Sequence, residues 1–166
     1  MTSTTLITVE EYLRLRVKPN CEYRDGVLYP KALATTAHGV LQFTVALMLI
    51  RLGLQAAPEV TVRLSPAKYL VPDVIAAPVL QNPYPTDPVL LCCEILSPED
   101  ELGAMFAKCE EYHAWGVPYC WVIDPVKRTA WEYNAGAEPA RVTEALHAGQ
   151  HAVSLDELFS EINTKA

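Results

Sequence analysis

The fold is decided by residues 89–123, VLLCCEILSPEDELGAMFAKCEEYHAWGVPYCWVI. The first eight of these are apolar except for Glu94, which is typical of a central strand buried on both faces apart from that glutamate. Residues 99 to about 115 place apolar side chains at helical spacing and predict an amphipathic helix. Residues 119–123 return to a strand pattern, so strands and helices alternate, as in an α/β (α+β) protein.

Local signals toward the N-terminus predict a short helix and a hairpin. Thr8 and Glu11 have the spacing of a capping box, which predicts a helix over about residues 9–16. Asp25-Gly26 is the dipeptide that suits a two-residue type I′ turn, and it predicts a hairpin of residues 21–24 and 27–30.

The remaining chain supplies further elements and a proline-marked loop. A helix is expected from Thr36 to about Leu54, because apolar residues recur there at helical spacing. The other predicted elements are strands over 59–64, 69–77 and 129–133, a loop at Pro83, Pro85 and Pro88, and a short helix opened by Ser154 and Glu157.

Bulk properties indicate one domain, residues 1–166, in the cytoplasm. The 166 residues are 51% apolar, enough for one sizeable core, and no apolar run has the length of a membrane span. Met1 to Thr8 has no signal-peptide pattern. Five cysteines without Cys-x-x-Cys spacing are expected to be reduced core residues. The net charge of -7 counts against a broad electrostatic surface for DNA, but a local basic groove and a metal ion can still engage phosphates.

Asp73 and Glu94 are lone carboxylates in otherwise apolar strands. A buried ionised carboxylate without a partner costs several kcal/mol, so such acids are paired, hydrogen-bonded, bound to metal or placed at a cleft. Pro72 favours a bent strand that turns Asp73 into a cleft. The alternative is that each acid caps a loop or pairs with a basic residue, and that Pro72 is an ordinary strand-edge proline.

Lys108 lies beside the apolar stripe of its predicted helix, so its ammonium either reaches water along Tyr112 and Trp115 or enters a polar pocket. In a pocket with Asp73 and Glu94, it completes a set able to act on phosphates. Magnesium takes one or two carboxylates plus water and substrate phosphate, and a lysine can stabilise transition-state charge.

Five segments, taken in order, carry a resemblance to a known family: CEYRDG (21–26), VPDV (71–74), EILSP (94–98), KCEEY (108–112) and WGVPYCWVIDP (115–125). Over about residues 5–135 the chain resembles the bacterial Uma family of restriction-endonuclease-like proteins. The resemblance implies the PD-(D/E)XK fold, a mixed sheet flanked by helices, and magnesium-dependent DNA cleavage, with Mn²⁺ as a substitute.

The resemblance also implies roles for particular residues. Asp73 and Glu94 match the family's two acids and metal ligands. The expected lysine two positions after Glu94 is absent, because that position is Leu96, and Lys108 matches the lysine that replaces it. Glu22 matches an auxiliary acid of the hairpin, and His38 matches a histidine that faces substrate.

Each of these matches has an alternative, and the chain also departs from the family. Glu22 could be a solvated hairpin residue and His38 a helix-start histidine that contacts backbone. Gly103-Ala104 replaces a helix acid, and Val27 stands where an acid follows the turn.

Two functions therefore stand. The first is a metal-dependent endonuclease that acts on DNA, with Asp73, Glu94, Lys108 and Glu22 as its site. The second is a catalytically silent nuclease-fold protein that binds a partner protein or nucleic acid. Phosphate-loop, serine-elbow and zinc-protease motifs are absent from the sequence, which argues against other metabolic enzymes. A homodimer is expected by analogy with nucleases that cut both strands.

Overall fold

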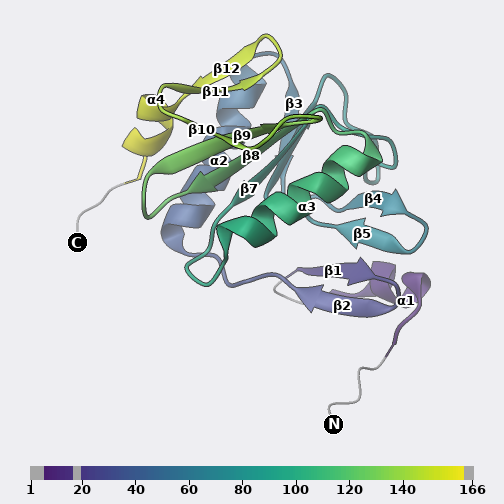
Figure 1. Cartoon of the computed structure of the whole chain (residues 1–166). Coiled ribbons are helices and arrows are strands. Elements are labelled where there is room, and N and C mark those ends of the chain that lie inside the picture. Colours follow the sequence, from purple (N-terminus) through teal and green to yellow (C-terminus); the bar gives the residue numbers. More distant parts are fainter. Residues whose placement is uncertain (1–5, 17–19, 163–166) are drawn as a thin grey trace.

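A mixed six-stranded sheet forms the centre of the molecule (Figure 1). The structure is a computed structural model that describes residues 6–16 and 20–162. The expectation drawn from Met1 to Thr8 therefore falls mainly outside the described residues. Within the described ranges, no helix is long and apolar enough to cross a membrane.

The helices are α1 (Val9–Arg14), α2 (Thr36–Arg51), α3 (Leu102–Trp115) and α4 (Leu155–Ser160). The strands are β1 (Cys21–Arg24), β2 (Val27–Pro30), β3 (Gln55–Pro58), β4 (Val62–Ser65), β5 (Lys68–Leu70), β6 (Val74–Ala77), β7 (Leu91–Ile95), β8 (Tyr119–Asp124), β9 (Thr129–Asn134), β10 (Ala140–Val142), β11 (Ala145–Ala148) and β12 (His151–Ser154).

The central sheet has the strand order β10-β9-β8-β7-β6-β3. β7 and β8 are parallel and are joined by α3, while the other neighbouring strands are antiparallel. This arrangement follows from the stretch 89–123, because parallel neighbours need a crossover connection that a helix supplies. The predicted mixed sheet flanked by helices is confirmed.

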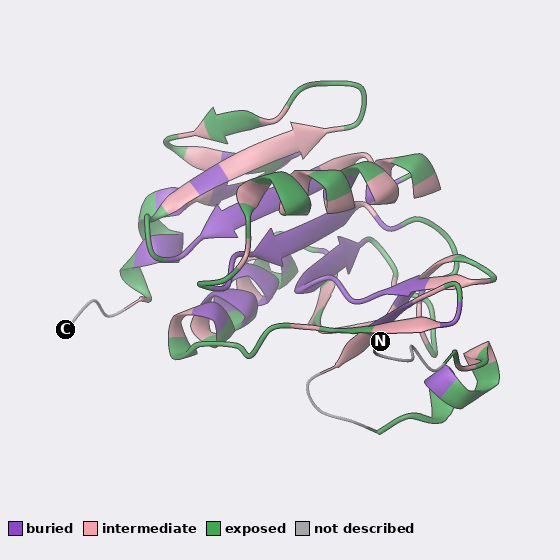
Figure 2. Ribbon diagram, turned by 60° about the horizontal axis from the view of Figure 1, so that its bottom comes forward, coloured by how far each residue is buried: buried purple, intermediate pink, exposed green. Residues whose placement is uncertain are grey.

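Each face of the sheet is covered by a helix, and the two faces form separate cores. Leu41, Val45 and Leu49 of α2 pack on one face. Cys109 and Tyr112 of α3 pack on the other. Figure 2 shows the central strands and the inner side of α2 buried, with the outer surfaces of the helices exposed. β7 is buried along its whole length, Glu94 included, so the expectation that its glutamate would escape burial is wrong.

A smaller sheet of order β2-β1-β5-β4 lies at one end of the molecule with α1 (Figure 1). Its hairpin turn is the predicted one, because Asp25 and Gly26 have φ values of 49° and 89°, as a type I′ turn requires. The capping box of α1 is also confirmed. The two sheets meet where the chain passes from β5 to β6.

The predicted strand 69–77 is in fact two strands that belong to different sheets. β5 ends at Leu70 and β6 begins at Val74, with Pro72 between them. Proline cannot donate a ladder hydrogen bond, so the chain leaves one sheet there and enters the other. The bend places Asp73 at the junction.

Other differences are confined to the ends of elements and to weakly patterned segments. α2 ends at Arg51 rather than near Leu54, because Gly53 takes a φ of 90°. The strand expected over 59–64 begins only at Val62. Four short strands, β3, β10, β11 and β12, were not predicted. The four core cysteines, Cys92, Cys93, Cys109 and Cys120, are buried free thiols as expected, whereas Cys21 is half-buried on β1.

Two glycines at opposite ends of α3 give a matched stability prediction. Gly116 has a φ of 121°, and a Cβ there would lie 2.8 Å from Cγ of Pro88. Gly103 has open space around its would-be Cβ. Gly116→Ala should lower the free energy of unfolding by about 1–3 kcal/mol. Gly103→Ala should raise the free energy of unfolding, by less than about 1 kcal/mol. Urea unfolding measures both, and equal effects would contradict the structure.

Candidate active site

A hollow of about 360 Å³ opens where the small sheet, the central sheet and α3 meet, and every candidate residue from the sequence lines it. Its lining comes from β1, from β2 and the segment after it, from α2, from the junction before β6, and from β7 and α3. The acidic, basic and histidine side chains among that lining are Glu22, Arg24, Lys31, His38, Glu59, Asp73, Glu94, Asp100, Lys108 and Glu111.

Asp73 directly precedes β6, and Glu94 lies on β7, the antiparallel neighbour of β6. Val74 of β6 pairs with Cys93 of β7, so one step further along the ladder sets Asp73 opposite Glu94. Both residues are 2% exposed. Two carboxylates buried side by side repel each other, so the structure around them must supply compensating charge.

Asp73 is held by donors on both carboxylate oxygens. Oδ1 lies 2.6 Å from Nζ of Lys31. Oδ2 accepts from the backbone N–H of Ile95 at 2.7 Å and from Nε2 of His38 at 3.2 Å. Burial alone would raise the pKa of Asp73, but the His38 hydrogen bond and the charge of Lys31 outweigh it and hold the pKa well below its usual range. Asp73 is therefore ionised at neutral pH.

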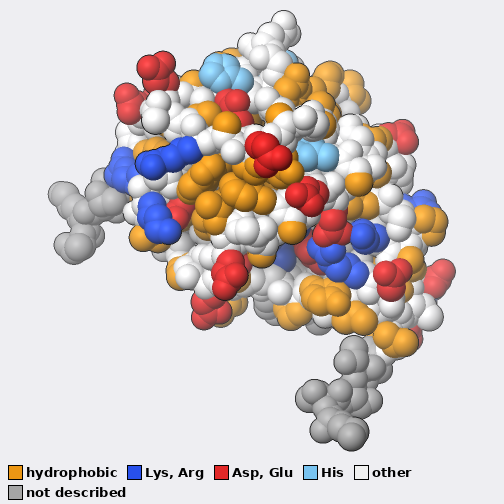
Figure 3. Space-filling model, in the orientation of Figure 1, with side chains coloured by type: hydrophobic (Ala, Val, Ile, Leu, Met, Phe, Trp, Pro, Cys, Tyr) orange, Lys and Arg blue, Asp and Glu red, His pale blue; other side chains and the backbone are white. Residues whose placement is uncertain are grey.

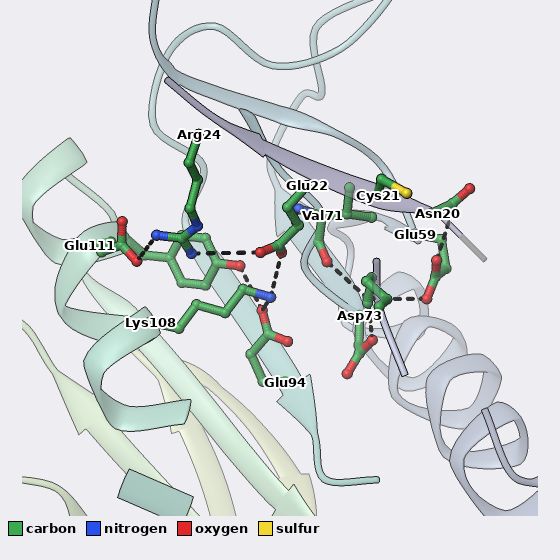
Figure 4. Close-up of polar contacts among 12 residues, drawn as sticks. Asn20, Cys21, Glu22, Arg24, Glu59, Val71, Asp73, Glu94, Lys108 and Glu111 are labelled. Atoms are coloured by element: carbon green, nitrogen blue, oxygen red, sulfur yellow. Dashed lines mark hydrogen bonds and ion pairs between the residues drawn. The ribbon is translucent and has the colours of Figure 1, made fainter. Parts of the chain in front are cut away.

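Lys108 bridges two acids from different sheets. Its Nζ lies 2.9 Å from Oε1 of Glu94 and 2.6 Å from Oε1 of Glu22, and the side chain points between them (Figure 4). The hydroxyl of Tyr112 also donates to Oε1 of Glu94, at 2.6 Å. The other oxygen of Glu94, Oε2, has no hydrogen bond from the described residues. The ammonium of Lys108 therefore enters a polar pocket and does not extend to water along Tyr112 and Trp115.

Charge and burial set the protonation of this group. Burial raises the pKa of Glu94 to about 6, with Lys108 opposing the rise and Asp73 adding to it. Burial would also lower the pKa of Lys108, but Glu94 and Glu22 hold it above its ordinary value. Lys108 is therefore a cation at neutral pH and has no lone pair with which to accept a proton.

The raised pKa of Glu94 predicts a pH-dependent difference between the wild type and Glu94→Gln, both kept free of metal with a chelator. The neutral carboxyl is favoured in the folded state, so its contribution is fully present below pH 4.5 and is lost as the pH rises through about 6. The wild type should lose roughly 2 kcal/mol of unfolding free energy relative to the variant between pH 4.5 and pH 7. Denaturant unfolding at several pH values measures this, and parallel curves would contradict it.

Glu22 and His38 both line the hollow, and neither has the contacts that its alternative interpretation requires. Glu22 is only 7% exposed, and its Oε1 also accepts from the backbone N–H of Val71 at 3.0 Å, so it is not a solvated hairpin residue. The side chain of His38 contacts Asp73 rather than backbone. Its Nδ1 is buried with no hydrogen-bond partner in the part of the chain that the structure describes.

Lys31, Glu59 and Gln42 belong to the site but were not predicted. Lys31 donates to Asp73 and Glu59, and Gln42 donates to Oε1 of Glu59 at 2.8 Å. The available signals were a lone lysine after the hairpin and a lone glutamine within the apolar face of α2. Neither signal identifies the partner of the residue, because the partner is distant in the sequence. Lys31 and Asp73, for example, are 42 residues apart.

A second group of ion pairs lies beside the first, and two of its members, Arg24 and Glu111, line the hollow. Arg24 pairs with Glu111 and, at 3.5 Å, with Glu22, while Lys68 pairs with Glu111 at 2.8 Å. On the face drawn in Figure 3, Lys and Arg side chains form small separate groups with acidic side chains between them. That face has no continuous basic surface, in keeping with the net charge of -7.

The donor set fits a hard divalent cation. Asp73 and Glu94 supply carboxylate oxygens, which Mg²⁺ prefers, and the remaining positions around the ion are usually filled by water and substrate phosphate. Among residues 6–16 and 20–162, no three His, Cys, Asp or Glu side chains are grouped to hold a metal.

The mixed sheet with its crossover helix, and the paired acids at its end, define a protein of the restriction-endonuclease-like fold. The chain belongs to the Uma2 family, described as "Putative restriction endonuclease", whose model matches residues 9–165. The resemblance seen in the sequence is therefore confirmed.

A solved structure supports the same fold. A "putative nuclease belonging to DUF820" from Anabaena variabilis is similar to this chain with a TM-score of 0.78 and 21% identity. The match covers 93% of this chain and 98% of that protein. No match is found among curated proteins.

Proposed function

We propose that the protein is a metal-dependent endonuclease that hydrolyses DNA phosphodiester bonds, with Asp73 and Glu94 holding Mg²⁺ or Mn²⁺. The observation that carries the proposal is the pair of buried carboxylates, Asp73 directly before β6 and Glu94 on β7, which line a hollow together with a buried lysine. Such a cluster is costly to fold, and a nuclease-fold protein has a use for it in binding a cation and a phosphate.

The bound cation would lower the pKa of a water molecule and neutralise charge on the phosphate. The chain's own residues supply the rest. Lys108, kept protonated by Glu94 and Glu22, stabilises negative charge that develops on the phosphate oxygens. Glu22 fixes the lysine in place as an auxiliary acid. His38 orients Asp73, and from the same hollow it can contact substrate.

The catalytically silent alternative keeps one observation in its favour. The cations that line the hollow, Arg24, Lys31 and Lys108, are all in ion pairs with acids, which leaves little free positive charge to attract a nucleic acid. The cytoplasmic location, the homodimer and the single domain over 1–166 stay predictions.

The test is cleavage of supercoiled plasmid and of single-stranded DNA by the purified chain, with Mg²⁺, with Mn²⁺ and with a chelator. Nicked or linear products that require the metal are expected. An RNA oligonucleotide in the same series separates DNA from RNA as substrate. Stable substrates in every condition, with metal still bound, would favour the silent alternative over the proposed activity.

A further inference from the structure

We infer that Lys31 is a resident counter-cation of Asp73, which a divalent metal ion must displace, so that Lys31 limits the metal affinity of the site. The inference rests on the proposed function, because it concerns how the proposed ligand Asp73 becomes available. Lys31 is not one of the residues that carry the family resemblance. It follows β2 directly and reaches Asp73 from the side of the hollow.

Of the groups that contact Asp73, the lysine ammonium of Lys31 is the one that we expect a metal ion to displace. On Oδ2, the Ile95 N–H is fixed by the backbone of β7, and His38 is held in the first turn of α2. On Oδ1, the closest donor is the ammonium of Lys31 at 2.6 Å, which belongs to a side chain and not to the backbone of the sheet. A divalent ion at this carboxylate and an ammonium in direct contact with it would repel each other, so binding one weakens binding of the other.

Lys31 has a second carboxylate to which it can retreat. Its Nζ also lies 3.1 Å from Oε1 of Glu59 and 2.9 Å from the carbonyl oxygen of Val71. Glu59 is held in place by Gln42 and by Asn20, whose Nδ2 donates to Oε2 at 2.7 Å (Figure 4). When a metal ion displaces Lys31 from Asp73, the lysine ammonium therefore still has a carboxylate partner. A buried ammonium without one would be strongly unfavourable.

The test is calorimetric titration of Mn²⁺ into the full-length chain and its variants, with no substrate present. Lys31→Met, which keeps the length of the apolar stem, should bind Mn²⁺ about tenfold more tightly than the wild type, a usual size for coupling between two binding events. Lys31→Gln is a second variant in case Met does not fold. Lys68→Met is the matched control, because it removes the same charge from Glu111 rather than from Asp73. Equal gains in the two lysine variants would overturn the inference.

Glu59→Gln tests whether Glu59 is the carboxylate that holds Lys31 once a metal ion occupies Asp73. In the wild-type background it should weaken Mn²⁺ binding, because Lys31 then has Asp73 as its remaining carboxylate. In the Lys31→Met background it should have no effect, whereas a direct metal ligand would lose affinity in both backgrounds. Unchanged affinity in Lys31→Met, with binding that still depends on Asp73, overturns the inference and leaves the proposed function standing. Absence of Mn²⁺ binding in the wild type and in Lys31→Met overturns both.

Discussion

Asp73→Ala is expected to abolish Mg²⁺ and Mn²⁺ binding while the protein stays folded. The substitution removes one of the two carboxylates that the proposed site offers, and a single carboxylate is too few for stable binding of the ion. Lys31 keeps Glu59 as a partner in this variant, so the loss of Asp73 does not leave it uncompensated. Titration heats measure the binding, and circular dichroism measures the fold.

Two further variants complete this prediction. Glu94→Ala should also lose the metal, whereas Asp156→Ala, on the exposed first turn of α4, should bind it like the wild type. Unchanged titration heats in Asp73→Ala or Glu94→Ala would remove that residue from the ligand set.

Lys108→Met is expected to lower the cleavage rate by about 10²- to 10³-fold, the usual effect of removing one group that stabilises transition-state charge. Metal binding should survive, because Lys108 contacts Glu94 through Oε1 only and is not itself a ligand. Methionine keeps the buried apolar stem, so the packing of α3 is little changed.

Cleavage and metal titration on the same preparation separate the two roles of Lys108. A variant that binds metal and cleaves as fast as the wild type would exclude Lys108 from the chemistry. Lys68→Met is again the control, since it removes a lysine that pairs with Glu111 and not with Glu94 or Glu22.

Local chemistry made much of the fold predictable. Asp25-Gly26 specified its hairpin because few dipeptides accept two successive positive φ values, and Thr8 with Glu11 specified the start of α1. Segments without such signals were missed. β10, β11 and β12 have only 3, 4 and 4 residues, which is too short for apolar alternation to stand out in the sequence.

The candidate site was predictable where a residue stood out against its surroundings. Asp73 and Glu94 are charges in apolar strands, and a side chain of that kind needs a partner. Lys31 and Glu59 lie between elements, where a charged residue is ordinary, and they acquire meaning only through a contact that spans the fold. The break at Pro72 also needed the structure, because a proline can end a strand or merely bend it.

The most direct test of the central claim is plasmid cleavage by the wild type and by Asp73→Ala, compared in one assay at saturating Mn²⁺ with protein concentrations matched. The account predicts metal-dependent nicking by the wild type that falls to background in the variant. Cleavage by Asp73→Ala at the wild-type rate would contradict it, since the activity would then not arise from the paired carboxylates of Asp73 and Glu94.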